Sequence, residues 1–102
     1  MSILAVAGGT REQSADEELS YQITTTNWVS TPTSPVVVAY DETTGETVTT
    51  TVFPTNSPSV ASDVITLSLL KSLTKGHTYR IEVKFTVGSN IYECFFRVQC
   101  TI

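Results

Sequence analysis

Two apolar–polar alternations near the end of the chain restrict its fold more than any other feature. Residues 79–87 (YRIEVKFTV) alternate without interruption, and residues 91–100 (IYECFFRVQC) alternate again after the turn sequence Gly88-Ser89-Asn90. Successive side chains of a strand point to opposite faces, so this period of two predicts a β-hairpin with one buried face. The residues expected on that buried face are Tyr79, Ile81, Val83, Phe85, Val87, Tyr92, Cys94, Phe96, Val98 and Cys100.

Shorter segments of strand character, separated by turn signals, precede this hairpin. We expect strands over residues 19–24, 35–41, 46–53 and 63–70, and a loop over the proline-containing residues 54–62. The residues expected to share one face of a strand are Leu19, Tyr21 and Ile23, then Val36, Val38 and Tyr40, and then Ile65, Leu67 and Leu69; the first and last sets are expected to point inward.

The composition agrees with a protein built from strands. Threonine, valine and isoleucine occupy 36 of the 102 positions, and β-branched residues fit a pleated strand better than a helix. No window has convincing helical periodicity, and the length allows one domain. The predicted fold is therefore all-β, and short strands separated by turn signals are typical of a sandwich.

The first 18 residues differ in character from the rest. A short apolar segment, residues 3–7, is followed by the polar and acidic residues 8–18 (GGTREQSADEE). We interpret residues 1–18 as an N-terminal arm with a flexible linker, and residues 19–102 as the sandwich domain. Because the first basic residue, Arg11, follows the apolar segment instead of preceding it, no signal peptide is expected.

A corner motif precedes the first strand of the hairpin. Leu73, Gly76 and Tyr79, in the sequence LTKGHTY, resemble the L-x-x-G-x-x-Y corner of fibronectin type III and related immunoglobulin-like sandwiches. The resemblance implies that the Tyr79 hydroxyl bonds to an upstream backbone group. It also implies an immunoglobulin-like, fibronectin type III-like fold over residues 19–102, in which about seven strands form a two-sheet sandwich. Trp28 departs from the fibronectin pattern, because it lies in a loop that follows residues 19–24 and not within a strand.

The residues offer little for catalysis or cofactor binding. The single histidine, His77, falls within the corner motif, where we expect it to face solvent. Cys94 and Cys100 are about 20 Å apart along one strand, too far for a disulfide, and are expected to be reduced and buried. We therefore expect no enzymatic activity, no catalytic residue, and no bound metal or other cofactor.

The charge and hydropathy of the chain argue against two classes of partner. The net charge is −4, and a phosphate-binding surface would need clustered Lys and Arg, so no nucleic-acid partner is expected. No apolar run approaches the roughly 20 residues of a membrane helix, so no membrane partner is expected either.

Two apolar elements are candidates for a protein interface. Ile91 and Phe95 are expected on the outward face of the last strand, which is often the edge of such a sandwich. Ile3, Leu4 and Val6 form the apolar part of the arm, which could add a strand to its own domain or to a neighbouring copy. The sequence leaves these two alternatives open.

The chain as a whole is similar to small virion proteins of tailed bacteriophages. The similarity lies in the Thr-rich sandwich, the stretch ITLSLLKSLTKGHTYRIEVKF and the short aromatic hairpin that follows it. It implies a capsid decoration, cement or tail-accessory subunit that assembles in the host cytoplasm with other virion proteins. Whether it also assembles with itself as a homo-oligomer is left open. The alternative is a carbohydrate- or cell-surface-binding module in which Trp28 stacks on a sugar.

Overall fold

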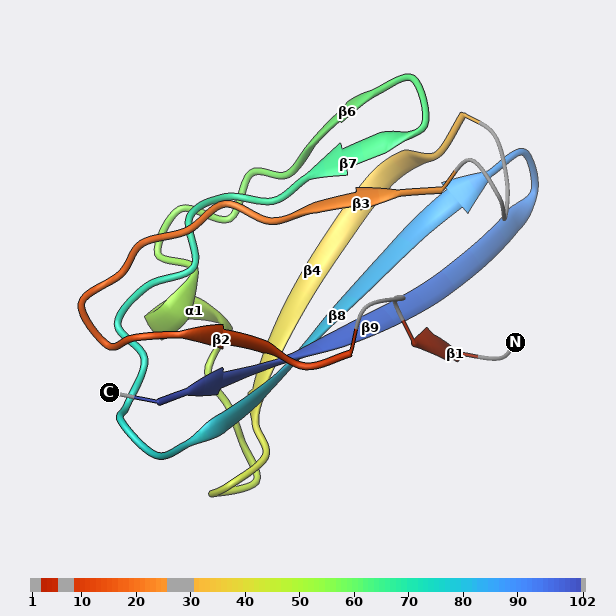
Figure 1. Ribbon diagram of the computed structural model, residues 1–102. Coiled ribbons are helices and arrows are strands. Elements are labelled where there is room, and N and C mark those ends of the chain that lie inside the picture. The colour runs from red at the N-terminus through yellow and green to blue at the C-terminus, as the bar shows by residue number, and fades with distance from the viewer. Residues whose placement is uncertain (1–2, 6–8, 26–30, 102) are drawn as a thin grey trace.

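The computed structural model describes residues 3–5, 9–25 and 31–101, which form two packed β-sheets (Figure 1). In the larger sheet the strand order is β1-β9-β8-β4-β5, and β2 also pairs with β9; the smaller sheet has the order β3-β7-β6. The strands are β1 (Ile3–Ala5), β2 (Arg11–Gln13), β3 (Gln22–Thr24), β4 (Thr33–Asp41), β5 (Glu46–Thr47), β6 (Ser59–Ala61), β7 (Val64–Thr66), β8 (Thr78–Val87) and β9 (Asn90–Cys100). The all-β, two-sheet character predicted from the sequence is confirmed.

The β8–β9 hairpin forms the centre of the larger sheet. Its antiparallel register runs from the pair Thr78–Gln99 to the pair Val87–Asn90. The side chains expected inside are buried along most of this length, and only Val87 and Tyr92, near the turn, are half-buried. Gly88 adopts a φ of 60° in the turn, a conformation that glycine reaches without steric cost.

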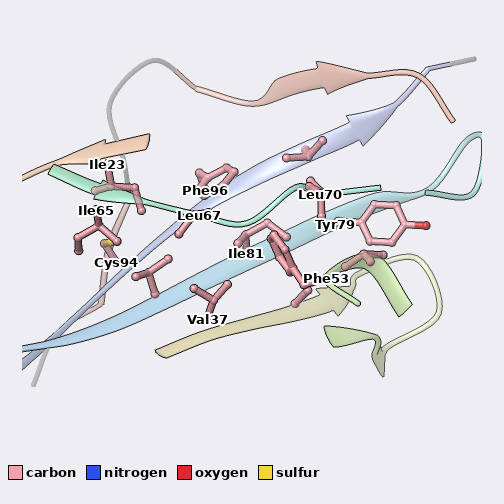
Figure 2. Close-up of a cluster of buried hydrophobic side chains, with 14 of the residues drawn as sticks. Ile23, Val37, Phe53, Ile65, Leu67, Leu70, Tyr79, Ile81, Cys94 and Phe96 are labelled. Carbon is pink, nitrogen blue, oxygen red and sulfur yellow. The ribbon is translucent and has the colours of Figure 1, made fainter. Parts of the chain in front are cut away.

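The core lies between the two sheets. Figure 2 shows side chains from both layers meeting there: Ile23, Ile65 and Leu67 come from the smaller-sheet side, and Val37, Ile81, Cys94 and Phe96 from the larger sheet. Each of these residues is less than 5% exposed. Burial of this apolar surface is the main force that holds the layers together.

The segment after β4 differs from the predicted strand over residues 46–53. Only β5, Glu46–Thr47, pairs with β4, and the chain then forms one helical turn, α1 (Thr49–Val52). A strand would send Val52 and Phe53 to opposite faces, whereas the turn lets both reach the core, where each is 1% exposed. Packing therefore overrides the strand preference of the Thr- and Val-rich segment.

Two further expectations around β7 were wrong. Residues 54–62 are not entirely loop, because Ser59–Ala61 forms β6 and pairs with β7. The alternation expected through Leu69 also fails: β7 ends at Thr66, and Leu70 instead forms a bridge with Leu19. Leu69 is consequently 47% exposed, while Leu70 is fully buried.

The N-terminal segment is paired to its own domain in the structure. β1 and β2 both run parallel to β9, at residues 93–95 and 98–100 respectively. β9 is therefore an interior strand of the larger sheet, and the expectation that it forms an edge was wrong. The expected flexible linker over residues 8–18 contains β2, and Gln13 of that strand makes three side-chain hydrogen bonds that are buried or partly buried.

Gln13 is 1% exposed, and its amide joins three parts of the chain. Its Nε2 donates to the carbonyl oxygens of Leu70 at 2.7 Å and Glu17 at 2.9 Å, and its Oε1 accepts from the Tyr21 hydroxyl at 2.9 Å. Burial, assisted by the charge of Glu17 and opposed by that of Arg11, raises the pKa of Tyr21 above 10.0, so the hydroxyl remains a donor at neutral pH. Gln13 thus connects β2 of the larger sheet to the chain around Tyr21 and Leu70.

Replacement of Gln13 by leucine should destabilise the fold by about 2–4 kcal/mol, because the Leu70 carbonyl and the Tyr21 hydroxyl would lose a buried partner. Urea unfolding measures the effect. The control is Glu12→Leu, which introduces the same residue at the exposed neighbouring position and should change stability by less than about 0.5 kcal/mol. Equal effects of the two changes would show that the Gln13 amide does not secure this segment.

Of the corner residues, Leu73 and Gly76 precede β8, and Tyr79 is the second residue of that strand. The Tyr79 hydroxyl accepts a hydrogen bond from the Thr74 backbone N–H at 2.7 Å, the type of bond that the corner resemblance implies. Tyr79 and Leu73 are buried, and Gly76 has a φ of 86°.

Loss of this hydroxyl in Tyr79→Phe should lower the free energy of unfolding by about 0.5–1.5 kcal/mol, since the Thr74 N–H would lose a part-buried hydrogen bond. Tyr92→Phe is the matched control, because the Tyr92 hydroxyl makes no hydrogen bond to any described residue. Chemical denaturation of both variants provides the comparison. A Tyr79→Phe variant as stable as wild type would mean that the corner hydrogen bond contributes nothing.

Candidate interaction surface

The face of the larger sheet that points away from the core carries both apolar and charged side chains. We define this outer face by three cross-strand rows on β4, β8 and β9, together with Ile91. The rows are Val36–Lys84–Glu93, Val38–Glu82–Phe95 and Tyr40–Arg80–Arg97. The alternating residues Val37 and Ala39 of β4 face the core instead.

Large apolar side chains are exposed on the outer face. Val36 is 54% exposed and Ile91 is 52% exposed, and Phe95 is half-buried. A shallow hollow of about 100 Å³ lies between β4 and the hairpin. Its lining residues are Val36, Val38, Tyr40, Glu82, Lys84 and Glu93.

The charges at the other end of the outer face are paired with one another. Glu42, directly after β4, lies 2.8 Å from Arg97 Nε through one carboxylate oxygen and 3.5 Å from Arg80 Nη1 through the other. Arg80 also lies over the Tyr40 ring, 5.2 Å from its centroid, and Arg97 over the Phe95 ring at 5.1 Å. These contacts cover much of the local charge with aromatic rings and an opposite charge.

The candidate interface residues from the sequence are only partly brought together. Ile91 and Phe95 lie on the outer face, as expected. The backbone of β1 places Ile3 and Leu4 opposite Glu93 and Cys94, so the arm pairs with the strand that carries Ile91 and Phe95. Val6 lies outside the described residues, as does Trp28, the candidate for sugar stacking.

Sequence reasoning missed the contribution of β4 to this surface. Val36, Val38 and Tyr40 were grouped on one face, but residues 35–41 are apolar on both faces, so alternation does not reveal which set is buried. The contacts of Glu42 with Arg80 and Arg97 were also missed, because they join residues far apart in the chain.

His77 is not the solvent-facing side chain that we expected. Its Nδ1 lies 2.7 Å from Oδ2 of Asp41, which is 5% exposed, while the other Asp41 oxygen accepts hydrogen bonds from the backbone N–H groups of Thr43 and Thr44. The pair therefore ties the turn after β4 to the corner motif. Partners for a buried carboxylate lower the cost of taking it out of water.

A second hollow, of about 300 Å³, lies between the residues that follow α1 and the residues that follow β7. It is lined by Pro54, Thr55, Ser68, Leu69 and Lys71. The Lys71 ammonium lies 3.7 Å from Glu18, a contact between partly exposed groups that contributes little binding energy on its own.

The cysteines have the environment of core residues. Cys94 and Cys100 are both free thiols and fully buried. Burial, with a smaller contribution from Glu93, raises the pKa of Cys94 from 9.0 to about 12, which suppresses the thiolate needed for nucleophilic chemistry.

The described part of the chain has neither a cluster of metal-ligating side chains nor a membrane-spanning helix. No group of three or more His, Cys, Asp or Glu residues could hold a metal ion among the described residues. Over the same residues, no helix has the length and apolar character to cross a membrane.

Neither a known protein family nor a curated protein sequence matches this chain.

The raised pKa of Cys94 predicts a loss of stability in alkaline solution. Above pH 9 the unfolded thiol loses its proton while the folded thiol keeps it until about pH 12, so the free energy of unfolding falls as pH rises through this window. The contribution of Cys94 approaches about 1.4 kcal/mol per pH unit. Urea unfolding at pH 8, 9, 10 and 11 measures the slope.

In this experiment Cys94→Ala should flatten the slope relative to wild type. Val83→Ala truncates the cross-strand neighbour of Cys94 and should lower stability at every pH while keeping the wild-type slope. A Cys94→Ala variant with the wild-type slope would contradict the claim that the Cys94 thiol causes the loss of stability in alkaline solution.

Proposed function

We propose that this protein is a non-enzymatic structural or assembly subunit that acts through protein–protein contacts on its outer face. The observation that carries the proposal is the exposure of Val36 and Ile91 on a sheet face that also holds half-buried Phe95, while the charges at the other end of this face are paired with one another. Large exposed apolar side chains on one sheet face are a feature of interaction sites, and interfaces are enriched in aromatic residues and Arg.

The edge of the larger sheet at β4 is less suited to pairing with another chain. Two of its backbone groups are occupied by side chains: the Ala39 N–H donates to Thr49 Oγ1 at 3.0 Å, and the Val37 carbonyl accepts from Asn56 Nδ2 at 3.0 Å. Pro35 has no N–H to offer. Blocked edges of this kind oppose strand addition, which favours contact through the face.

The finer fold assignment that we propose is an immunoglobulin-like or fibronectin type III-like sandwich. The order β3-β7-β6 in one sheet and β9-β8-β4 in the other supports it, since these orders correspond to the B-E-D and G-F-C strands of such sandwiches. The hydrogen bond between Tyr79 and Thr74 gives further support.

The biological setting that we propose is the virion of a tailed bacteriophage, with assembly in the host cytoplasm. The support is the similarity to small phage proteins described above, together with a low-charge surface rich in Thr and Ser. Such a surface suits close packing beside other proteins better than electrostatic steering of a charged ligand. The partners would be other capsid or tail proteins, or further copies of the same chain.

The test combines sedimentation of the purified protein over a range of concentrations with its co-sedimentation with particles of the phage that encodes it. The double variant Val36→Lys/Ile91→Lys should weaken self-association or particle binding at least about tenfold, because two apolar contacts would become charged. The matched control Ser59→Lys/Ala61→Lys adds the same charge to exposed positions of β6 in the opposite sheet and should have little effect.

Equal weakening by both double variants would argue against the outer face as the contact. A wild-type protein that neither self-associates nor sediments with the particles would refute the proposed function itself.

A further inference from the structure

Two arginines occupy directly opposite positions at the end of the outer face. Arg80 of β8 and Arg97 of β9 are cross-strand partners, an arrangement that is destabilising unless other groups compensate the like charges. The carboxylate of Glu42 supplies this compensation by contacting both guanidinium groups, at 3.5 Å and 2.8 Å. The two arginines therefore already hold one carboxylate between them.

Both guanidinium groups are held in place while remaining accessible. Arg80 lies over the Tyr40 ring and Arg97 over the Phe95 ring, so neither depends on Glu42 alone for its orientation. The side chains of Arg80 and Arg97 are 36% and 43% exposed. A site that exists before its ligand arrives loses less entropy on binding.

Glu82 compensates only one of the two arginines. Its Oε2 lies 3.0 Å from Arg80 Nε, but that buried nitrogen has no aligned hydrogen-bond partner among the described residues. Glu42 is thus the only acidic residue in the described chain that contacts both guanidinium groups.

Glu42 can leave the arginines without disturbing the strands. Its backbone N–H donates to the Thr78 carbonyl at 2.8 Å, which anchors the main chain, while the side chain extends from the end of β4 and is 27% exposed. The turn that follows it, residues 43–45, is exposed to solvent. Only rotation of the Glu42 side chain is needed to free the site.

We propose that Arg80 and Arg97 form a binding site for a carboxylate side chain of a partner protein, and that Glu42 is an internal occupant which this carboxylate displaces. The inference rests on the proposed function, because it specifies the partner chemistry at the same outer face. Arg80 and Arg97 are offset by Glu42 and Glu82, so the four side chains carry no net charge, and a monoanion meets less repulsion here than a phosphate dianion. Phe95 and Val38 lie beside the site, so the partner segment carries its acidic residue among apolar ones.

The experiment uses a blocked tripeptide, acetyl-Val-Glu-Val-amide, as the probe, and detects binding through the Nε–H resonances of the arginines in NMR titrations. Glu42→Gln should bind the peptide about tenfold more tightly than wild type, since two partly exposed ion pairs no longer compete. Glu46→Gln is the matched control: it removes the same charge from a neighbouring exposed position that has no described contact with either arginine. It should bind like wild type.

Two further measurements complete the test. Arg97→Gln added to Glu42→Gln should abolish the gain, and acetyl-Val-Gln-Val-amide should not bind. The inference is overturned if Glu42→Gln binds no better than Glu46→Gln, if the glutamine peptide binds equally well, or if inorganic phosphate competes more strongly than the glutamate peptide. Any of these results would leave the sedimentation test of the outer face unaffected, so failure of this inference and failure of the proposed function are distinguishable.

Discussion

The register between β8 and β9 is the constraint on which the rest of the structure depends. Because side chains alternate between faces, a slip of β8 by one residue would move Ile81, Val83 and Phe85 to solvent and bring charged residues such as Glu82 into the core. The same register aligns Arg80 with Arg97 on the outer face. β4 adds to one side of the hairpin, and β1 and β2 add to the other, so one pairing determines both the core and the candidate interaction surface.

Two buried polar side chains, Gln13 and Asp41, form hydrogen bonds between segments of the chain outside the apolar core. Gln13 has hydrogen-bond partners for both amide hydrogens and for its oxygen, which makes its burial tolerable. Asp41 similarly accepts from two backbone N–H groups and contacts His77. Both networks join segments that are distant in sequence. Gln13 attaches the short strand β2 to the chain around Leu70, and Asp41 attaches the turn after β4 to the chain around His77.

Strict alternation made β8 and β9, their buried faces and the outward positions of Ile91 and Phe95 predictable from the sequence. β2 and α1 were not predictable in this way, because each is determined by contacts with distant residues instead of a local pattern. Gln13 lies in a polar segment of the sequence, and its role depends on hydrogen bonds with Leu70 and Tyr21 that no local pattern predicts. Residues 35–41 are apolar on both faces, so the sequence did not predict which side chains of β4 are buried and which belong to the outer face.

The apolar and charged parts of the outer face support association for complementary reasons. Val36 and Ile91 gain from leaving water, whereas an unpaired arginine would lose its hydration on contact. Glu42 keeps Arg80 and Arg97 compensated in the free protein, and a partner carboxylate would keep them compensated in the complex. A partner without an acidic residue at this point would bury the ion pairs of Glu42 with Arg80 and Arg97 and would form no new ion pair with either arginine. Specificity would thus arise from exchange of one carboxylate for another, while the neighbouring apolar side chains provide most of the affinity.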